Sequence, residues 1–86
     1  NGKIDLIIKY KEKTYGIELK TYTNKASYKE ALKQAARYGS QLGLKKIYLS
    51  FFVESINDEN RKKFEAVFED PETGVKVEPV FVETGG

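Results

Sequence analysis

The chain has 86 residues and carries 15 basic against 13 acidic side chains, and it contains neither cysteine nor histidine. This length suits a single hydrophobic core, so we expect residues 1–86 to form one domain. The absence of cysteine excludes disulfides, zinc-thiolate sites and cysteine nucleophiles. Without histidine, any catalysis would use Asp, Glu, Lys, Tyr, Ser or Thr, together with a hard, oxygen-liganded cation such as Mg²⁺ or Mn²⁺.

No apolar stretch approaches the roughly 18 residues of a membrane span, and no secretory signal is visible. We therefore expect no membrane partner and a cytoplasmic location. The net charge of +2 is too small to identify a polyanionic partner, although basic residues gather between Lys20 and Arg37. Because the chain starts at Asn1-Gly2 without a methionine, we expect a domain excised from a longer chain.

Two strands joined by a short turn are expected at the start of the chain. Residues 4–10 are rich in β-branched and aromatic side chains, and residues 15–22 follow after a charged connection of four residues. Since side chains alternate along a strand, Glu18 and Lys20 should point to the same face.

A helix is expected next, with Ser27 as its N-cap and Glu30 completing a capping box. Gly43 is well placed as the left-handed residue after the helix end. The expected buried stripe, at helical spacing, consists of Tyr28, Ala31, Ala35, Tyr38, Gly39 and Leu42.

The chain should continue with a third strand and a second helix. Residues 47–53 form an almost uninterrupted apolar run, which is typical of a strand covered on both faces. A helix is expected from about residue 58 to residue 68, capped by Asn57. Its expected buried edge consists of Phe64, Val67 and Phe68.

After a turn at residues 71–74, residues 75–82 alternate as a final strand, in which Pro79 favours an edge position or a bulge. The expected order is β-β-α-β-α-β. These elements predict an α/β (α+β) fold, with a small mixed β-sheet and helices packed on it.

Charged residues of the first two strands form the candidate site. Asp5 interrupts an apolar strand start, where a carboxylate needs a cation or hydrogen-bond donors. Together with Glu18 and Lys20 it would place two carboxylates and an amine at one edge of the sheet. The simpler interpretation is a solvated strand face for Glu18 and Lys20 and a hydrated strand-end residue for Asp5.

Gln34 and Tyr38 lie four residues apart on the first helix and could face the sheet edge, or they could be ordinary boundary residues. Tyr22 or Tyr28 could stack on a base. Candidate phosphate contacts, each equally consistent with a solvated helix face, are Lys25, Lys29, Lys33 and Arg37.

The segments that carry a family resemblance are Gly2-x-Ile4-Asp5-Leu6-Ile7-Ile8, Ile17-Glu18-Leu19-Lys20, Gln34-x-x-x-Tyr38, Leu42-Gly43-Leu44 and Ile47-Tyr48-Leu49. In these segments the chain resembles the PD-(D/E)XK nuclease superfamily. It looks most like the nuclease-like domains found at the C-terminus of bacterial AAA-type ATP-binding proteins. The resemblance implies a restriction-endonuclease-like core and makes an ATPase domain in the same full-length chain an expected partner.

The resemblance also implies roles for the site residues. Asp5 and Glu18 would bind Mg²⁺ (or Mn²⁺), Lys20 would orient the attacking water, and Gln34 and Tyr38 would support the site or contact nucleic acid. The backbone carbonyl of Leu19 is a candidate third oxygen ligand.

The expected function is therefore a metal-dependent nuclease that hydrolyses phosphodiester bonds of nucleic acid, with DNA favoured. One alternative is a nuclease-fold module of weak or no catalytic activity that binds nucleic acid. Another is a protein-interaction domain beside an ATPase, in which the carboxylates hold a salt bridge with Lys20.

Overall fold

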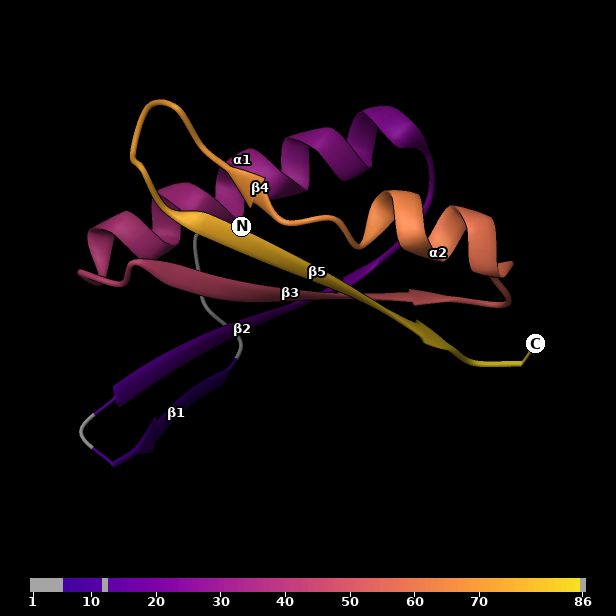
Figure 1. Ribbon diagram of the computed structural model, residues 1–86. Helices are drawn as coiled ribbons and strands as arrows, with labels where there is room; N and C mark the ends of the chain where they lie inside the picture. Colours follow the sequence, from indigo (N-terminus) through magenta and orange to yellow (C-terminus); the bar gives the residue numbers. More distant parts are fainter. Residues whose placement is uncertain (1–5, 12, 86) are drawn as a thin grey trace.

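The computed structural model describes residues 6–11 and 13–85 and has a five-stranded mixed sheet with two helices (Figure 1). This confirms the expected α/β class. In chain order the elements are β1 (Leu6–Tyr10), β2 (Lys13–Thr21), α1 (Lys25–Gln41), β3 (Lys46–Val53), α2 (Asp58–Phe64), β4 (Phe68–Glu69) and β5 (Lys76–Glu83). The strand order across the sheet is β1-β2-β3-β5-β4.

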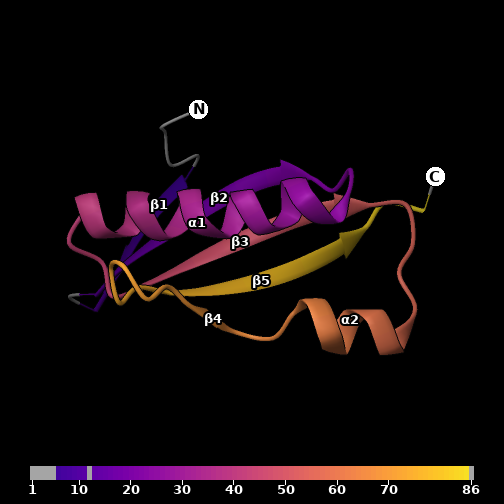
Figure 2. The ribbon, with the colours of Figure 1, turned by 90° about the horizontal axis from the view of Figure 1, so that it is seen from above.

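Both helices lie on the same face of the sheet (Figures 1 and 2). The pairs β2–β3 and β3–β5 are parallel, whereas β1–β2 and β4–β5 are antiparallel. The helical connections between the parallel strands both advance in the same direction across the sheet. Two right-handed crossovers in one direction place their helices on one face, and the opposite face is left open among the described residues.

The core lies between this sheet face and α1. Every second residue of β3 and β5 is buried, including Ile47, Leu49, Phe51, Val77 and Phe81. The expectation that β3 is covered on both faces is wrong, because the intervening residues are only half-buried on the face that carries no helix.

The N-cap of α1 is Asn24, not Ser27. The Asn24 side chain accepts a hydrogen bond from the Ser27 backbone N–H at 2.8 Å, so Ser27 lies within the first turn. Asparagine is as good an N-cap as serine, and the earlier start gives Tyr28 a full helical turn before it enters the core.

The C-terminus of α1 has the geometry expected from Gly43, whose φ is +72°. The Leu44 N–H donates to the Gly39 carbonyl and the Gly43 N–H to the Ser40 carbonyl, which is a Schellman motif. Leu42, expected to be buried, is the C-cap residue and is 47% exposed. Leu32 and Ala36 complete the buried stripe instead.

The second helix is shorter than expected. Asn57 caps it as predicted, but α2 ends at Phe64 because residues 68–69 pair with β5 as the additional strand β4. Phe64 and Phe68 are half-buried, whereas Val67 is 53% exposed and does not belong to the buried edge.

Pro79 lies in β5 beyond the two residues that pair with β4, so the outer edge of the strand is open at this point. This confirms the expected edge position. The side chains of Arg61 in α2 and of Glu65, just after the helix, take the place of a neighbouring strand at Phe81. Its N–H donates to Glu65 Oε2 at 2.7 Å, and its carbonyl accepts from Arg61 Nη1 at 2.8 Å.

Candidate functional site

Glu18 and Lys20 share the helix-covered face of β2, which confirms the prediction that they point the same way. Glu18 lies opposite Leu49 and Lys20 opposite Phe51 in the parallel register with β3, and both of these partners are core residues. The register therefore places the two charged side chains on the core side of the sheet.

Glu18 is only 2% exposed, while Lys20 is partly exposed. The simpler interpretation of Glu18 as a solvated strand residue is therefore wrong. Burying a carboxylate is costly unless a cation, a metal or hydrogen-bond donors stabilise it. A buried acid two residues before a lysine that lines a pocket is accordingly a candidate functional residue.

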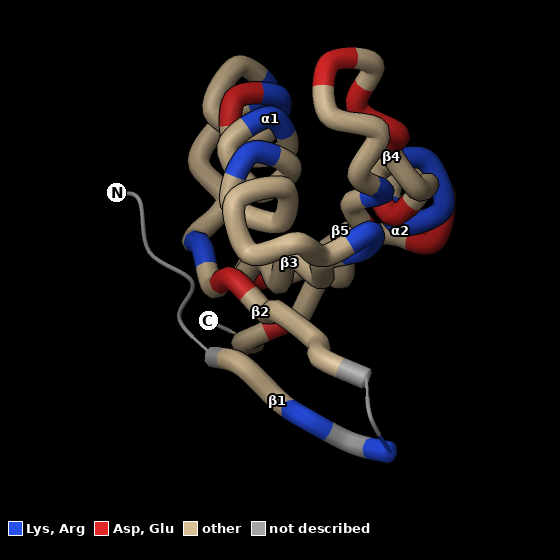
Figure 3. Tube along the Cα trace, turned by 90° about the vertical axis from the view of Figure 1, so that its left-hand side faces the viewer, with Lys and Arg blue, Asp and Glu red and all other residues tan. Residues whose placement is uncertain are grey.

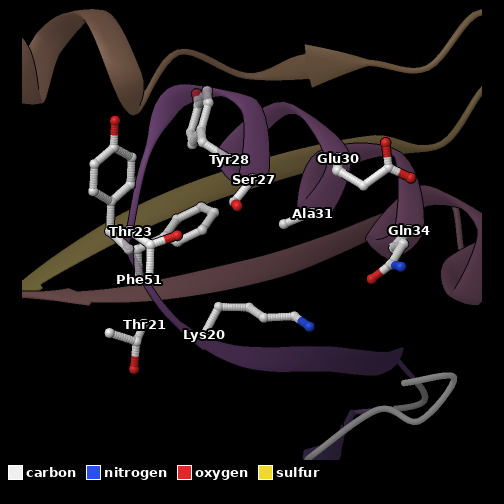
Figure 4. A pocket seen from close by; sticks show the side chains of 10 residues that line it. Lys20, Thr21, Thr23, Ser27, Tyr28, Glu30, Ala31, Gln34 and Phe51 are labelled. Atoms are coloured by element: carbon white, nitrogen blue, oxygen red, sulfur yellow. The ribbon is translucent and has the colours of Figure 1, made fainter.

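Lys20 leads into a pocket of about 180 Å³ at the carboxyl end of β2, between this strand and the first half of α1 (Figure 4). The Lys20 side chain extends along the pocket, with its amine on the side where Gln34 and Glu30 lie. The lining consists of residues 20–23, of Ser27, Tyr28, Glu30, Ala31 and Gln34 from α1, and of Phe51.

The pocket brings Lys20 and Gln34 together, so Gln34 faces the sheet edge, one of the two positions that its spacing left open. Tyr38 is half-buried and does not line this pocket. Ser27 and Glu30 were not among the expected site residues, although they precede Gln34 by seven and four positions. This helical spacing is the signal that would have found them.

The four basic residues of α1 are all exposed, and none of them lines the pocket. At about 100° per residue, Lys25 and Lys29 lie roughly 180° and 140° around the helix from Gln34. Lys33 lies about 100° away and Arg37 about 60° away. Arg37 is thus the basic residue of α1 best placed to act with the pocket.

Tyr28 is part of the packed interior rather than a free base-stacking surface. Its ring centroid lies 5.3 Å from that of Phe51 and 5.2 Å from that of Phe64, and its hydroxyl donates to the Phe64 carbonyl at 2.7 Å. Burial, with a smaller contribution from Tyr22, raises the pKa of Tyr28. Tyr22 lines the same pocket and is half-buried, so its ring is more accessible to a ligand than the buried ring of Tyr28.

The expected metal ligands are only partly within the described residues. Asp5 lies outside them. Glu18 and the backbone carbonyl of Leu19 are oxygen donors of the kind that Mg²⁺ prefers, and the Leu19 side chain is 45% exposed on the opposite face. Among the described residues, no group of three or more Asp or Glu side chains could hold a metal ion. The donor type fits Mg²⁺, while the number of carboxylates depends on Asp5.

Comparison of the chain with protein-family models, curated proteins and solved structures finds no match. Within the part of the chain that the structure describes, neither helix is long and apolar enough to cross a membrane. The functional assignment therefore depends on the residues of the chain itself.

Proposed function

We propose that the chain is a metal-dependent nuclease domain that hydrolyses phosphodiester bonds of nucleic acid, with DNA as the favoured substrate. The observation that carries the proposal is the burial of Glu18 two residues before Lys20, whose side chain enters a pocket shared with Gln34. A cytoplasmic location and an ATPase domain in the full-length chain belong to the same proposal.

In this proposal Asp5 and Glu18 hold one Mg²⁺ ion, with the Leu19 carbonyl as a further oxygen ligand. The ion, when bound, supplies an acidified water and offsets charge on the phosphate. Lys20 positions the attacking water and stabilises the negative charge that develops on the phosphate oxygens. The Gln34 amide, across the pocket, offers hydrogen-bond donors to the same phosphate.

Hydrolysis adds the water oxygen to phosphorus and breaks the bond to the leaving ester oxygen, which takes up a proton from solvent water. Because the chain has no histidine, the water proton passes to bulk water or to a substrate phosphate group. Arg37, the basic residue of α1 nearest to Gln34 around the helix, would contact a neighbouring phosphate.

The second candidate function is a nuclease-fold module that binds nucleic acid without effective catalysis. It is favoured by the exposed basic residues of α1, which could contact phosphates without any metal ion. Under this alternative Glu18 has a structural role, and metal binding is weak.

The deciding experiment is titration calorimetry with Mn²⁺ on the native chain and on Asp5→Asn, Glu18→Gln and Glu30→Gln. We expect saturable binding that weakens at least tenfold in the first two variants. Glu30→Gln is the matched control, since Glu30 is an exposed carboxylate in the same pocket. Lys20→Ala should keep metal binding but lose about 10²–10³-fold in cleavage rate.

The nuclease proposal fails if Mn²⁺ does not bind saturably, or if binding is indifferent to Asp5→Asn and Glu18→Gln. DNA binding with a steep salt dependence would then support the binding module, because a steep slope reports phosphate contacts.

A further inference from the structure

Three segments that are distant in the sequence lie at the same end of the sheet, opposite the end where the Lys20 pocket opens. They are the turn between β1 and β2, the connection from α1 to β3, and the start of β5. Lys46 pairs with Lys76 in the parallel register, and the Lys76 N–H donates to the Lys45 carbonyl at 3.0 Å. Figure 3 looks onto this end of the molecule.

This end is rich in exposed lysine. The exposed lysines from the three segments are Lys9, Lys11, Lys45, Lys46 and Lys76. The clustering reflects an uneven distribution of charge along the chain, since residues 1–50 carry 11 basic against 4 acidic side chains and residues 51–86 carry 4 against 9. Acidic residues accompany some of these lysines, since Glu78 pairs with Lys46 and Glu69 lies opposite Lys76 in the β4–β5 register.

A groove of about 760 Å³ opens beside two of these lysines, Lys45 and Lys46. Thr14 and Tyr15 of β2 line one part of it, and residues 42–46 with Tyr48 line the rest. We call it the lysine–tyrosine groove. It is separate from the Lys20 pocket, because Tyr15 and Lys20 are five residues apart along β2, which is about 17 Å.

Two half-buried tyrosines give the groove an aromatic wall. The ring centroids of Tyr15 and Tyr48 are 6.3 Å apart and their planes are tilted by 40°. Lys46 Nζ lies 5.2 Å from the centre of the Tyr48 ring and 2.6 Å from Glu78 Oε1. Lys46 is thus partly neutralised, which leaves Lys45 as the groove lysine best placed to contact an anion.

We propose that the lysine–tyrosine groove is a second contact site for nucleic acid and that it takes a single strand. Lysines bind the phosphates, and an unpaired base stacks on Tyr15. Aromatic rings interleaved with basic side chains are the chemistry by which proteins hold single strands, and the ring has no access to a base that is stacked within a duplex. The choice of ligand rests on the proposed function, whereas the groove does not depend on catalysis.

The test is fluorescence anisotropy with a labelled 15-nucleotide oligothymidylate in the presence of EDTA, so that no metal-dependent step takes part. We expect Lys45→Gln to weaken binding about threefold and to reduce the salt slope by roughly 0.7, the value for one lost contact on a single strand. Tyr15→Leu, which keeps apolar bulk but removes the aromatic ring, should weaken binding about tenfold or more. A duplex of equal length should compete poorly.

Lys62→Gln is the matched control, because it removes the same charge from an exposed position on α2. An equal loss in the two lysine variants, or no loss in Tyr15→Leu, would contradict binding at the groove. So would the absence of binding, or equal competition by an acidic polypeptide. Glu18→Gln should bind the oligonucleotide normally. A loss of Mn²⁺ binding therefore tests the proposed nuclease site, whereas a loss of oligonucleotide binding in EDTA tests the lysine–tyrosine groove.

Discussion

Single residues show how burial decides chemical role in this small domain. Glu18 and Tyr28 both carry polar groups into the interior, and the Tyr28 hydroxyl donates a hydrogen bond to the Phe64 carbonyl at 2.7 Å. Tyr28 therefore joins α1 to the end of α2, and we assign it to stability rather than to ligand binding.

The first prediction concerns Tyr28 and pH. Since burial raises the pKa of Tyr28 above its usual value near 10, the folded protein keeps the phenolic proton at a pH where the unfolded chain releases it. The stabilisation is complete below about pH 10 and is lost as the pH rises through the folded-state pKa. The free energy of unfolding of the native chain should thus fall as the pH rises above 10.

Tyr28→Phe should lower the free energy of unfolding by about 1 kcal/mol at pH 7, the usual value of one hydrogen bond. Above pH 10 the variant should lose less stability than the native chain, because the titrating group is gone. Urea unfolding at pH 7, 9.5 and 11 measures both effects. Tyr38→Phe, at a half-buried position of the same helix, serves as the control. Identical pH profiles for the native chain and Tyr28→Phe would contradict this assignment.

Among the secondary-structure elements, α2 has a role that its length does not suggest. It has 7 residues, none of them buried, so packing alone gives it little stability. Its Arg61 side chain and the following Glu65 instead bind the backbone of Phe81 at the open edge of β5. Arg61 also lies 3.0 Å from Glu65 Oε2 and 3.7 Å from Glu83 Oε1. These contacts both anchor the helix and cover a strand edge that could otherwise pair with another chain.

The second prediction follows at this scale. Glu65→Ala should lower the free energy of unfolding by about 1–3 kcal/mol. The substitution removes the carboxylate oxygen that accepts hydrogen bonds from both the Phe81 N–H and Arg61. Denaturant unfolding measures the loss, and hydrogen exchange at the Phe81 amide should become faster. Lys62→Ala, an exposed neighbour in α2, should change stability by less than about 0.5 kcal/mol. Unchanged exchange at Phe81 would argue against the edge contact.

At the scale of the whole molecule, the sheet has one covered and one open face (Figure 2). The open face is largely apolar, with exposed fractions of 42% at Ile8, 45% at Leu19, 37% at Val80 and 39% at Val82. An apolar sheet face of this kind raises the tendency to associate. It arises from topology, since both crossovers place their helices on the other side.

The third prediction compares the two faces through β5. Val80→Thr and Val82→Thr keep the β-branched shape and should each change the free energy of unfolding by less than about 0.5 kcal/mol. Val77→Thr, on the same strand but fully buried, should cost about 1–3 kcal/mol because its hydroxyl enters the core. Thermal or urea unfolding distinguishes the two outcomes. Equal losses on both faces would mean that the open face is covered in solution.

The sequence predicted the local parts of this fold because they depend on nearest neighbours along the chain. Gly43 indicated where α1 ends, and Asn57 indicated where α2 begins. The alternation of side chains along the strand indicated that Glu18 and Lys20 share a face. Each of these signals acts within one helical turn or one strand. The start of α1 was placed too late, because Ser27 and Asn24 are equally good caps and only the burial of Tyr28 selects between them.

Other features were decided by the tertiary structure alone. The sequence shows that Glu18 is charged, but only its position on the core side of the folded sheet makes it buried. The pairing of β3 with β5 likewise brings Lys45 and Lys46 beside Lys76, which lies far from them in the sequence. β4 exists because two residues meet β5 across a turn, and the open sheet face exists because both crossovers advance in one direction. The sequence determined which elements form and which residues share a face, since that information is local. Burial, charge clustering and the choice of covered face depend on contacts between distant segments, which only the assembled fold defines.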